Sequence, residues 1–151
     1  NGILFNHESP FRGTNFVTNK IVKTAVAIKL GLEKKLVLGN LDAYRDWGHA
    51  KDYVIAMHKI LSHKVPDDFV IASGKTYSVR QFCEKTFKKL GMNYKNYVVQ
   101  HKKYFRPGEV PFLKGDASKA RKILKWSPKY TIDNLIDEMI DTWMKTLDNK
   151  K

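Results

Sequence analysis

Short apolar runs alternate along this chain with longer segments whose apolar residues recur at helical spacing. The runs of strand length are 2–7, 35–39, 68–74 and 97–100. The helical patterns are 16–30, 49–63, 79–90, 117–124 and a last one that opens at Thr131. Strands that alternate with helices in this way predict an α/β fold with a parallel sheet.

The helical patterns also predict buried faces and start signals. The residues expected to face the core from the second helix are Tyr53, Met57, Ile60 and Leu61. Ser78 and Gln81 have the spacing of a capping box ahead of the third helix. Thr14 or Asn15 can accept the first free backbone N–H groups of the first helix.

Composition limits the partners and the compartment. The net charge of +13 favours anionic partners, namely nucleic acid, anionic lipid or phosphorylated ligands. The cations are scattered, with the densest run at 101–106, so nucleic acid is disfavoured without being excluded. No apolar run approaches the roughly 18 residues of a membrane span, and we expect no membrane partner. Cys83, the only cysteine, lies on an apolar helix face and is expected in the core, and a reducing, cytoplasmic location fits this cysteine count.

Arginines beside turns are the first candidates for ligand binding. Arg12, Arg45 and Arg106 each stand next to glycine or proline, where a fixed guanidinium could bind a phosphate through two donors. The polar segment 6–9 ends the first strand, at the sheet edge where open α/β folds bind ligands. No glycine-rich phosphate loop occurs, and the histidines lack the spacing of a metal site.

The residues after Arg45 are open to several interpretations. Asp46 could cap the helix that begins near His49, or it could hold Arg45 in place. Trp47 is expected to pack in the interior and to donate its indole N–H to the backbone.

Several ordered motifs together resemble a known family. They are "NGILFNHESP", "RGTNFVTNKI", "LGNLDAYRDWGHAKDYV", "DDFVIASGKTYSVRQF", "YFRPGEV" and "GDASKAR". From residue 1 to about residue 144 the chain resembles the GDP-mannose 4,6-dehydratases, which belong to the extended short-chain dehydrogenase/reductase superfamily. The resemblance implies the C-terminal part of a Rossmann-type fold together with the smaller substrate-binding domain.

The resemblance also implies that part of the family's sequence is not in this chain. The family's G-x-x-G-x-x-G turn, its catalytic Thr and Glu and its Tyr-x-x-x-Lys helix have no counterpart in residues 1–151, which begin with Asn rather than Met. The chain therefore looks cut from a longer protein, without the N-terminal Rossmann half. No catalytic residue is assigned, and the chain alone is expected to be inactive.

The family's reaction defines the expected ligands. NADP oxidises the 4-hydroxyl of GDP-mannose, water is lost across carbons 5 and 6, and the hydride returns to carbon 6. The 4-ketone acidifies the neighbouring proton, which explains why oxidation comes first. The product, GDP-4-keto-6-deoxymannose, leads towards GDP-fucose, and the complete enzyme is expected to be a dimer or tetramer. Two alternatives stay open: another nucleotide-sugar epimerase or dehydratase of the superfamily, and a basic nucleic-acid-binding module.

By resemblance, two sets of residues are assigned to ligands. The residues matching NADP contacts are His7 and Arg12. The residues matching nucleotide-sugar contacts are Asn6, Val17, Lys20, Asn40, Arg45, Arg106 and Glu109. Phe11, Asn19 and Tyr44 stand where the family usually has a cation, which is expected to weaken secondary contacts.

Overall fold

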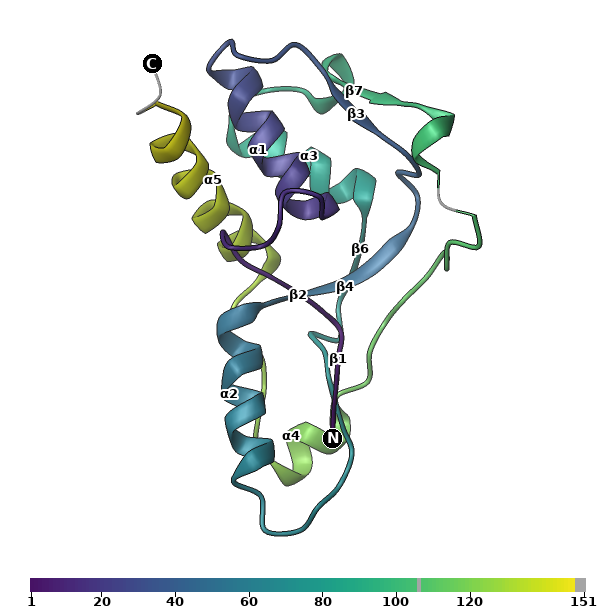
Figure 1. The fold of residues 1–151 in the computed structure, drawn as a ribbon, viewed down its shortest axis with the longest axis vertical. Coiled ribbons are helices and arrows are strands. Elements are labelled where there is room, and N and C mark those ends of the chain that lie inside the picture. Colours follow the sequence, from purple (N-terminus) through teal and green to yellow (C-terminus); the bar gives the residue numbers. More distant parts are fainter. Residues whose placement is uncertain (106, 149–151) are drawn as a thin grey trace.

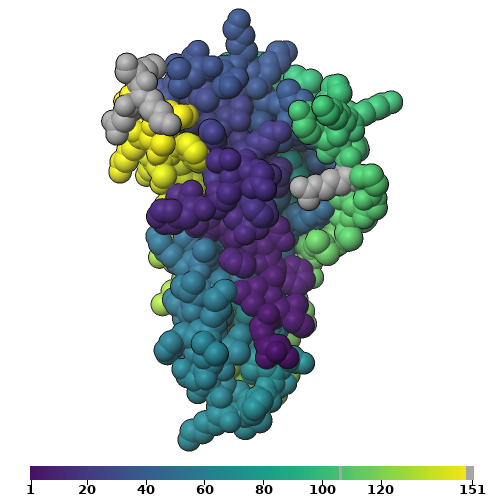
Figure 2. All heavy atoms as spheres, viewed as in Figure 1, coloured from purple at the N-terminus to yellow at the C-terminus, as the bar shows by residue number. Residues whose placement is uncertain are grey.

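The computed structural model describes residues 1–105 and 107–148, and in it the molecule has two parts joined by a small sheet. The lower part in Figure 1 holds β1, α2 and α4, and the upper part holds α1, α3, α5, β3 and β7. Strands β2, β4 and β6 lie between the two parts (Figure 1). The N-terminal residues run along the surface of the face shown in Figure 2, up to the start of α1.

Seven short strands form three separate sheets within the described residues. They are β1 (Gly2–Leu4), β2 (Asn6–Glu8), β3 (Leu36–Leu38), β4 (Tyr44–His49), β5 (Phe69–Ile71), β6 (Thr76–Ser78) and β7 (Val98–Gln100). The pairs β1–β5, β2–β4 and β3–β7 are parallel, whereas β4 and β6 are antiparallel. The α/β class and the parallel pairing are confirmed, but the division into three sheets and the antiparallel strand β6 were not predicted. Strands β4 and β6 escaped prediction because neither has an apolar run or a clear alternation.

The helices follow the predicted periodicities closely. They are α1 (Val17–Lys29), α2 (Ala50–Leu61), α3 (Val79–Lys89), α4 (Ser118–Ile123) and α5 (Ile132–Asp148), with 3₁₀ turns η1 (Tyr94–Asn96) and η2 (Lys102–Tyr104). The capping box of Ser78 and Gln81 is confirmed at α3. The prediction that Thr14 or Asn15 caps α1 was wrong, because Phe16 occupies the N-cap position and no side chain forms a capping hydrogen bond there. None of the described helices is long and apolar enough to cross a membrane.

Two apolar cores lie in the two parts of the molecule. The upper core is centred on Ile21, Phe82, Phe87 and Ile136, contributed by α1, α3 and α5. Its members include Cys83, which is buried as expected, and burial raises the pKa of its thiol to about 12. The lower core is centred on Tyr53, Phe69, Ile71 and Trp126.

Two of the four α2 residues predicted to face the core are exposed instead. Tyr53 is buried and Ile60 packs partly against the lower core, as expected. Leu61, however, is 87% exposed and Met57 is also exposed. Val54 and Ile55 add to this surface, so α2 presents apolar side chains to solvent.

Candidate functional site

A cavity of about 330 Å³ lies where α1 begins, where β3 and β4 meet, and beside η2. Its wall is formed by Asn6, Asn15, Phe16, Val17, Lys20, Leu38, Gly39, Asn40, Arg45, Trp47, Val79, Tyr104 and Glu109. These residues come from segments far apart in sequence, so the cavity exists only because of the tertiary fold. Its size is at the lower end of the usual range for small-molecule sites.

The cavity brings together six of the seven residues predicted to contact the nucleotide sugar. Asn6 comes from β2, Val17 and Lys20 from the first turn of α1, and Asn40 follows β3. Arg45 and Glu109 complete this set. The seventh, Arg106, lies outside the described residues.

Arg45 is a strand residue of β4, rather than a turn residue as predicted. Its Nη1 donates to the carbonyl oxygens of Tyr44 and Val110, each at 2.8 Å. Its Nη2 lies 3.1 Å from Oε1 of Glu109, whose Oε2 accepts from Nδ2 of Asn40 at 3.1 Å. These contacts tie the loop after η2 to β4. Three of the five guanidinium N–H donors are thereby used, and the other two have no partner among residues 1–105 and 107–148 and could bind a ligand.

Lys20 is held in a fixed position at the cavity wall. Its Nζ donates to the carbonyl oxygen of Val37 at 2.7 Å, which links α1 to β3. The same ammonium group lies over the ring of Tyr104, 4.7 Å from the ring centroid. The charge of Lys20 therefore reaches the cavity without a carboxylate partner among the described residues.

The two residues assigned to NADP lie outside this cavity lining. His7 Nδ1 lies 2.9 Å from the carbonyl oxygen of Phe5, and its ring stacks on Tyr53 at 4.8 Å. The guanidinium of Arg12 covers the ring of Phe16, with 3.6 Å between the guanidinium carbon and the ring centroid. Because Phe16 itself lines the cavity, Arg12 stands directly behind one of its walls.

A buried carboxylate, Glu8, supports Arg12. Glu8 Oε2 lies 3.3 Å from Arg12 Nε and accepts from Thr18 Oγ1 at 2.6 Å. Burial raises the pKa of Glu8, although Thr18 and Arg12 oppose that shift. Sequence reasoning gave Glu8 no role of its own, since its contacts depend on how α1 packs against β2.

Asp46 has neither of its two predicted roles. Its buried Oδ1 accepts from the backbone N and the Oγ of Ser73, at 2.9 and 2.6 Å. Its Oδ2 accepts from the backbone N of Gly74 and of Gly115, at 2.9 and 3.2 Å. Because adjacent strand residues point to opposite faces, Asp46 turns away from the Arg45 side chain. It ties together the loops after β5 and before α4 instead.

The helix cap assigned to Asp46 belongs to His49. The Nδ1 of His49 accepts from the backbone N of Lys51 at 3.1 Å, so the ring proton sits on Nε2 and is donated to Glu138 Oε2 at 2.7 Å. Lys51 Nζ donates to the other oxygen of Glu138 at 2.8 Å, and this bond is the main cause that lowers the pKa of Glu138.

The indole N–H of Trp47 does not bond to the backbone as predicted. Trp47 is buried, and its Nε1 has no hydrogen-bond partner within residues 1–105 and 107–148. The ring packs edge-on against Phe82, with 5.2 Å between centroids. The interpretation of Trp47 as a packing residue is therefore confirmed.

Sequence reasoning missed most of the apolar cavity wall. Phe16, Leu38, Val79 and Tyr104 line it, but they carried no functional signal beyond apolar or aromatic character. Tyr104 belongs to the charged run 101–106 and begins the motif "YFRPGEV", but it was given no role of its own.

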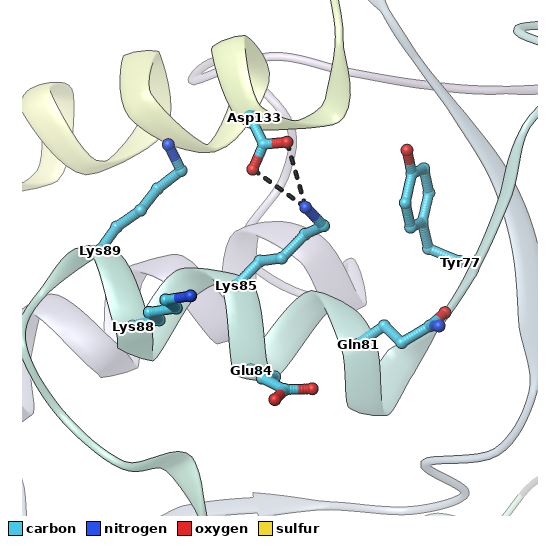
Figure 3. Close-up of a pocket in the computed structure, with 7 residues that line it drawn as sticks. All are labelled: Tyr77, Gln81, Glu84, Lys85, Lys88, Lys89 and Asp133. Carbon is cyan, nitrogen blue, oxygen red and sulfur yellow. Dashed lines mark hydrogen bonds and ion pairs between the residues drawn. The ribbon is translucent and has the colours of Figure 1, made fainter.

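A larger depression of about 630 Å³ lies elsewhere, between α3 and α5 (Figure 3). Figure 3 shows Lys85 between Asp133 and Tyr77, and its Nζ donates to both carboxylate oxygens of Asp133 at 3.2 and 3.1 Å. Lys89 pairs with Asp137 of α5 at 2.7 Å. These lysines are engaged by α5, and no predicted site residue lines the depression. The smaller cavity is therefore the candidate site.

Comparison with known sequences points to one family. The family model described as "GDP-mannose 4,6 dehydratase" matches residues 1–139. The chain is 52% identical over 141 residues to GDP-mannose 4,6 dehydratase 1 of Arabidopsis thaliana, an alignment that covers 93% of this chain and 39% of that protein. It is 48% identical over 157 residues to the GDP-mannose 4,6 dehydratase of Homo sapiens, covering 93% of this chain and 42% of that protein. The chain thus spans about two fifths of the length of these relatives.

Solved structures with the same fold include nucleotide-sugar enzymes. RMD from Pseudomonas aeruginosa, complexed with NADPH, aligns with a TM-score of 0.87 at 22% identity, over 96% of this chain and 48% of that one. The dTDP-glucose 4,6-dehydratase of Bacillus anthracis, in complex with NAD, aligns with a TM-score of 0.81 at 21% identity, over 97% and 44%. At these identities the likeness concerns the fold alone, and it confirms the predicted Rossmann-type α/β fold. The family match over residues 1–139 and the relatives at about half identity show that this chain belongs to the GDP-mannose 4,6-dehydratase family.

Proposed function

We propose that the chain is the nucleotide-sugar-binding part of a GDP-mannose 4,6-dehydratase. The observation that carries this proposal is the cavity that unites Asn6, Val17, Lys20, Asn40, Arg45 and Glu109. The family resemblance assigns the same six residues to the nucleotide sugar. Chance proximity is a poor explanation, since the segments that supply them span about a hundred positions of sequence.

Within this proposal, Arg45 and Lys20 bind the negative charge of the substrate. Arg45 offers two unused N–H donors and is fixed by Tyr44, Val110 and Glu109, so little side-chain entropy is lost on binding. Asn40 and Glu109 stand beside it and can bond to ribose hydroxyls. The role of these residues is to orient the sugar for chemistry carried out by groups outside this chain.

The cofactor of the proposed reaction is NADP, which when bound supplies the oxidation of the sugar and the return of the hydride. His7 and Arg12 would hold it. Arg12 fits an anionic group, because its guanidinium is positively charged and its side chain is 26% exposed, while its buried Nε faces Glu8. Phe16 and Glu8 fix the guanidinium from two sides, which prepares it for a phosphate.

The two cores suggest how the parts are divided. We assign the lower part, with β1, β5, α2 and α4, to the end of the NADP-binding Rossmann fold, and the upper part to the nucleotide-sugar-binding domain. The division is supported by the parallel pairing of β1 with β5 and by the position of the cavity above it. A homo-oligomeric state and a cytoplasmic location stay predictions for the complete protein.

A chimera tests the proposed function directly. The matched segment of the Arabidopsis thaliana enzyme would be replaced by this chain, and formation of the 4-keto product from GDP-mannose and NADP would be measured. We expect activity from the chimera and none from residues 1–151 alone. An inactive but folded chimera, or activity of the isolated chain, would contradict the assignment.

Ligand competition separates the two alternatives. Preference for a UDP- or dTDP-sugar over GDP-mannose in the chimera would favour another enzyme of the superfamily. A gel shift with duplex DNA that persists at ~150 mM salt would favour the nucleic-acid-binding module, because non-specific phosphate binding weakens steeply with salt.

A further inference from the structure

The ring of Tyr104 has an unusual combination of exposure and support for a residue in a loop. The side chain is half exposed at the cavity wall, although an exposed tyrosine ring ordinarily has no fixed position. Here the ammonium group of Lys20 lies over it, and that ammonium is itself fixed by the carbonyl oxygen of Val37. The ring therefore has a partner that holds it in place while half of its surface stays open.

The backbone of Tyr104 is fixed as well. The 3₁₀ turn η2 begins at His101, whose Nδ1 accepts from the backbone N of Lys103 at 3.2 Å. Gly39 lies directly against this turn, since a Cβ atom at Gly39 would stand only 2.1 Å from the carbonyl oxygen of Tyr104. The close approach of the two backbones places η2 against the end of β3 and sets the position of the ring.

The cavity wall combines a polar group with apolar and aromatic side chains. Arg45, Asn40 and Glu109 form a connected polar group. The rest of the described wall includes the ammonium group of Lys20 and the apolar or aromatic side chains of Phe16, Val17, Leu38, Trp47, Val79 and Tyr104. Arg12 covers the ring of Phe16 as Lys20 covers that of Tyr104, so two of these three aromatic side chains have a cation against them.

We infer that Tyr104 is the stacking platform for the nucleobase, with Lys20 acting as its support. This inference rests on the proposed function and deepens it. A nucleoside diphosphate has a flat aromatic base at one end and an anionic group at the other, and the cavity wall offers an exposed aromatic ring for the first and cationic side chains for the second. The anionic end belongs with the free donors of Arg45, and this leaves the base for the exposed ring. Stacking on an aromatic ring tolerates any base, and a purine offers the larger surface.

Two ligands that differ by the nucleoside test the inference. GDP carries both the base and the diphosphate, whereas inorganic pyrophosphate carries only the anionic group. Calorimetric titration of the chimera that carries this chain would compare, for each ligand, the wild-type sequence with Tyr104→Leu and Tyr104→Phe. We expect Tyr104→Leu to weaken GDP binding about 5-fold to 150-fold, the range for loss of one base–aromatic stack. Pyrophosphate binding should change less than about twofold by the same reasoning, and Tyr104→Phe should bind GDP nearly as the wild type does.

Tyr130 offers a matched control. It is similarly exposed and has the ammonium group of Lys51 over its ring at 5.5 Å, but it lies outside the candidate cavity. Tyr130→Leu should leave GDP binding unchanged. An equal loss for Tyr130→Leu, or an equal loss of GDP and pyrophosphate for Tyr104→Leu, would mean a structural effect and overturn the inference.

The remaining outcomes separate this inference from the proposed function. If the wild type binds GDP and Tyr104→Leu binds it equally well, Tyr104 is not the platform, while the cavity keeps its proposed role. If the wild type binds neither GDP nor GDP-mannose, the proposed function is wrong, and so is the proposed role of Tyr104 as a stacking platform.

Discussion

Replacing Asp46 with asparagine would test whether one buried carboxylate holds two loops against β4. The substitution preserves size and shape, so it leaves no cavity. It keeps one oxygen for Ser73 but replaces the other by an NH₂ group, which cannot accept from the backbone N–H groups of Gly74 and Gly115. A hydrogen bond to a charged group contributes about 1.5–3 kcal/mol, so the loss of two should lower the free energy of unfolding by about 3–6 kcal/mol.

Urea unfolding followed by circular dichroism measures this change. Asp116→Asn is the matched control, because Asp116 is exposed and its carboxylate accepts from the backbone N of Ser118 at the surface. We expect a much smaller loss for the control. A loss below about 1 kcal/mol for Asp46→Asn would refute the reasoning, since two buried N–H groups without acceptors should cost at least that much.

Three further predictions concern binding, pH dependence and association. In the chimera, Arg45→Ala should weaken GDP-mannose binding by about 1.5–3 kcal/mol and NADP binding much less, as measured by calorimetry. Arg45→Lys should restore only part of the lost affinity. Equal losses of affinity for both ligands would mean that Arg45 has a structural role. Glu138 has a pKa below its ordinary value of 4.5, chiefly because Lys51 donates to it, so its contribution to stability is present above pH 4.5 and is lost as the pH falls through the lowered pKa. Urea midpoints between about pH 5 and pH 3 should therefore fall less steeply for Glu138→Gln than for the wild type, and parallel curves would contradict this. The exposed apolar face of α2 should make the isolated chain self-associate. The double variant Leu61→Lys, Val54→Lys should reduce this association in analytical ultracentrifugation. A wild-type chain that is monomeric at high concentration would show that this face does not cause self-association.

The helices could be predicted from sequence because each carries its own periodicity. Helix α5 has apolar residues at 132, 135, 136, 139 and 140, and this spacing places them on one face whatever the neighbours are. The capping box at α3 is likewise local, since Ser78 and Gln81 satisfy each other's backbone. Strand β4 was missed because its residues Arg45, Asp46 and Trp47 become strand-like only through pairing with β2 and β6.

The contacts within the candidate site, like strand β4, could not be predicted from local sequence patterns. Resemblance located six wall residues, but it did not indicate which groups they contact. Resemblance assigned Lys20 to the diphosphate, but the contacts of its ammonium group with Val37 and Tyr104 were not predicted. Such contacts depend on how the segment after β7 folds back over β3, and no local pattern in the sequence encodes that packing.

The two cores are built from interleaved stretches of the chain. The lower core takes residues near 4–5, 53–72 and 117–126, and the upper core takes residues near 17–47, 77–98 and 132–147. The polypeptide therefore crosses from one core to the other five times. No single cut can release either core as a continuous segment, so neither could be exchanged between proteins as an independent module. Ending the chain anywhere before residue 117, or starting it after residue 17, removes residues from both cores.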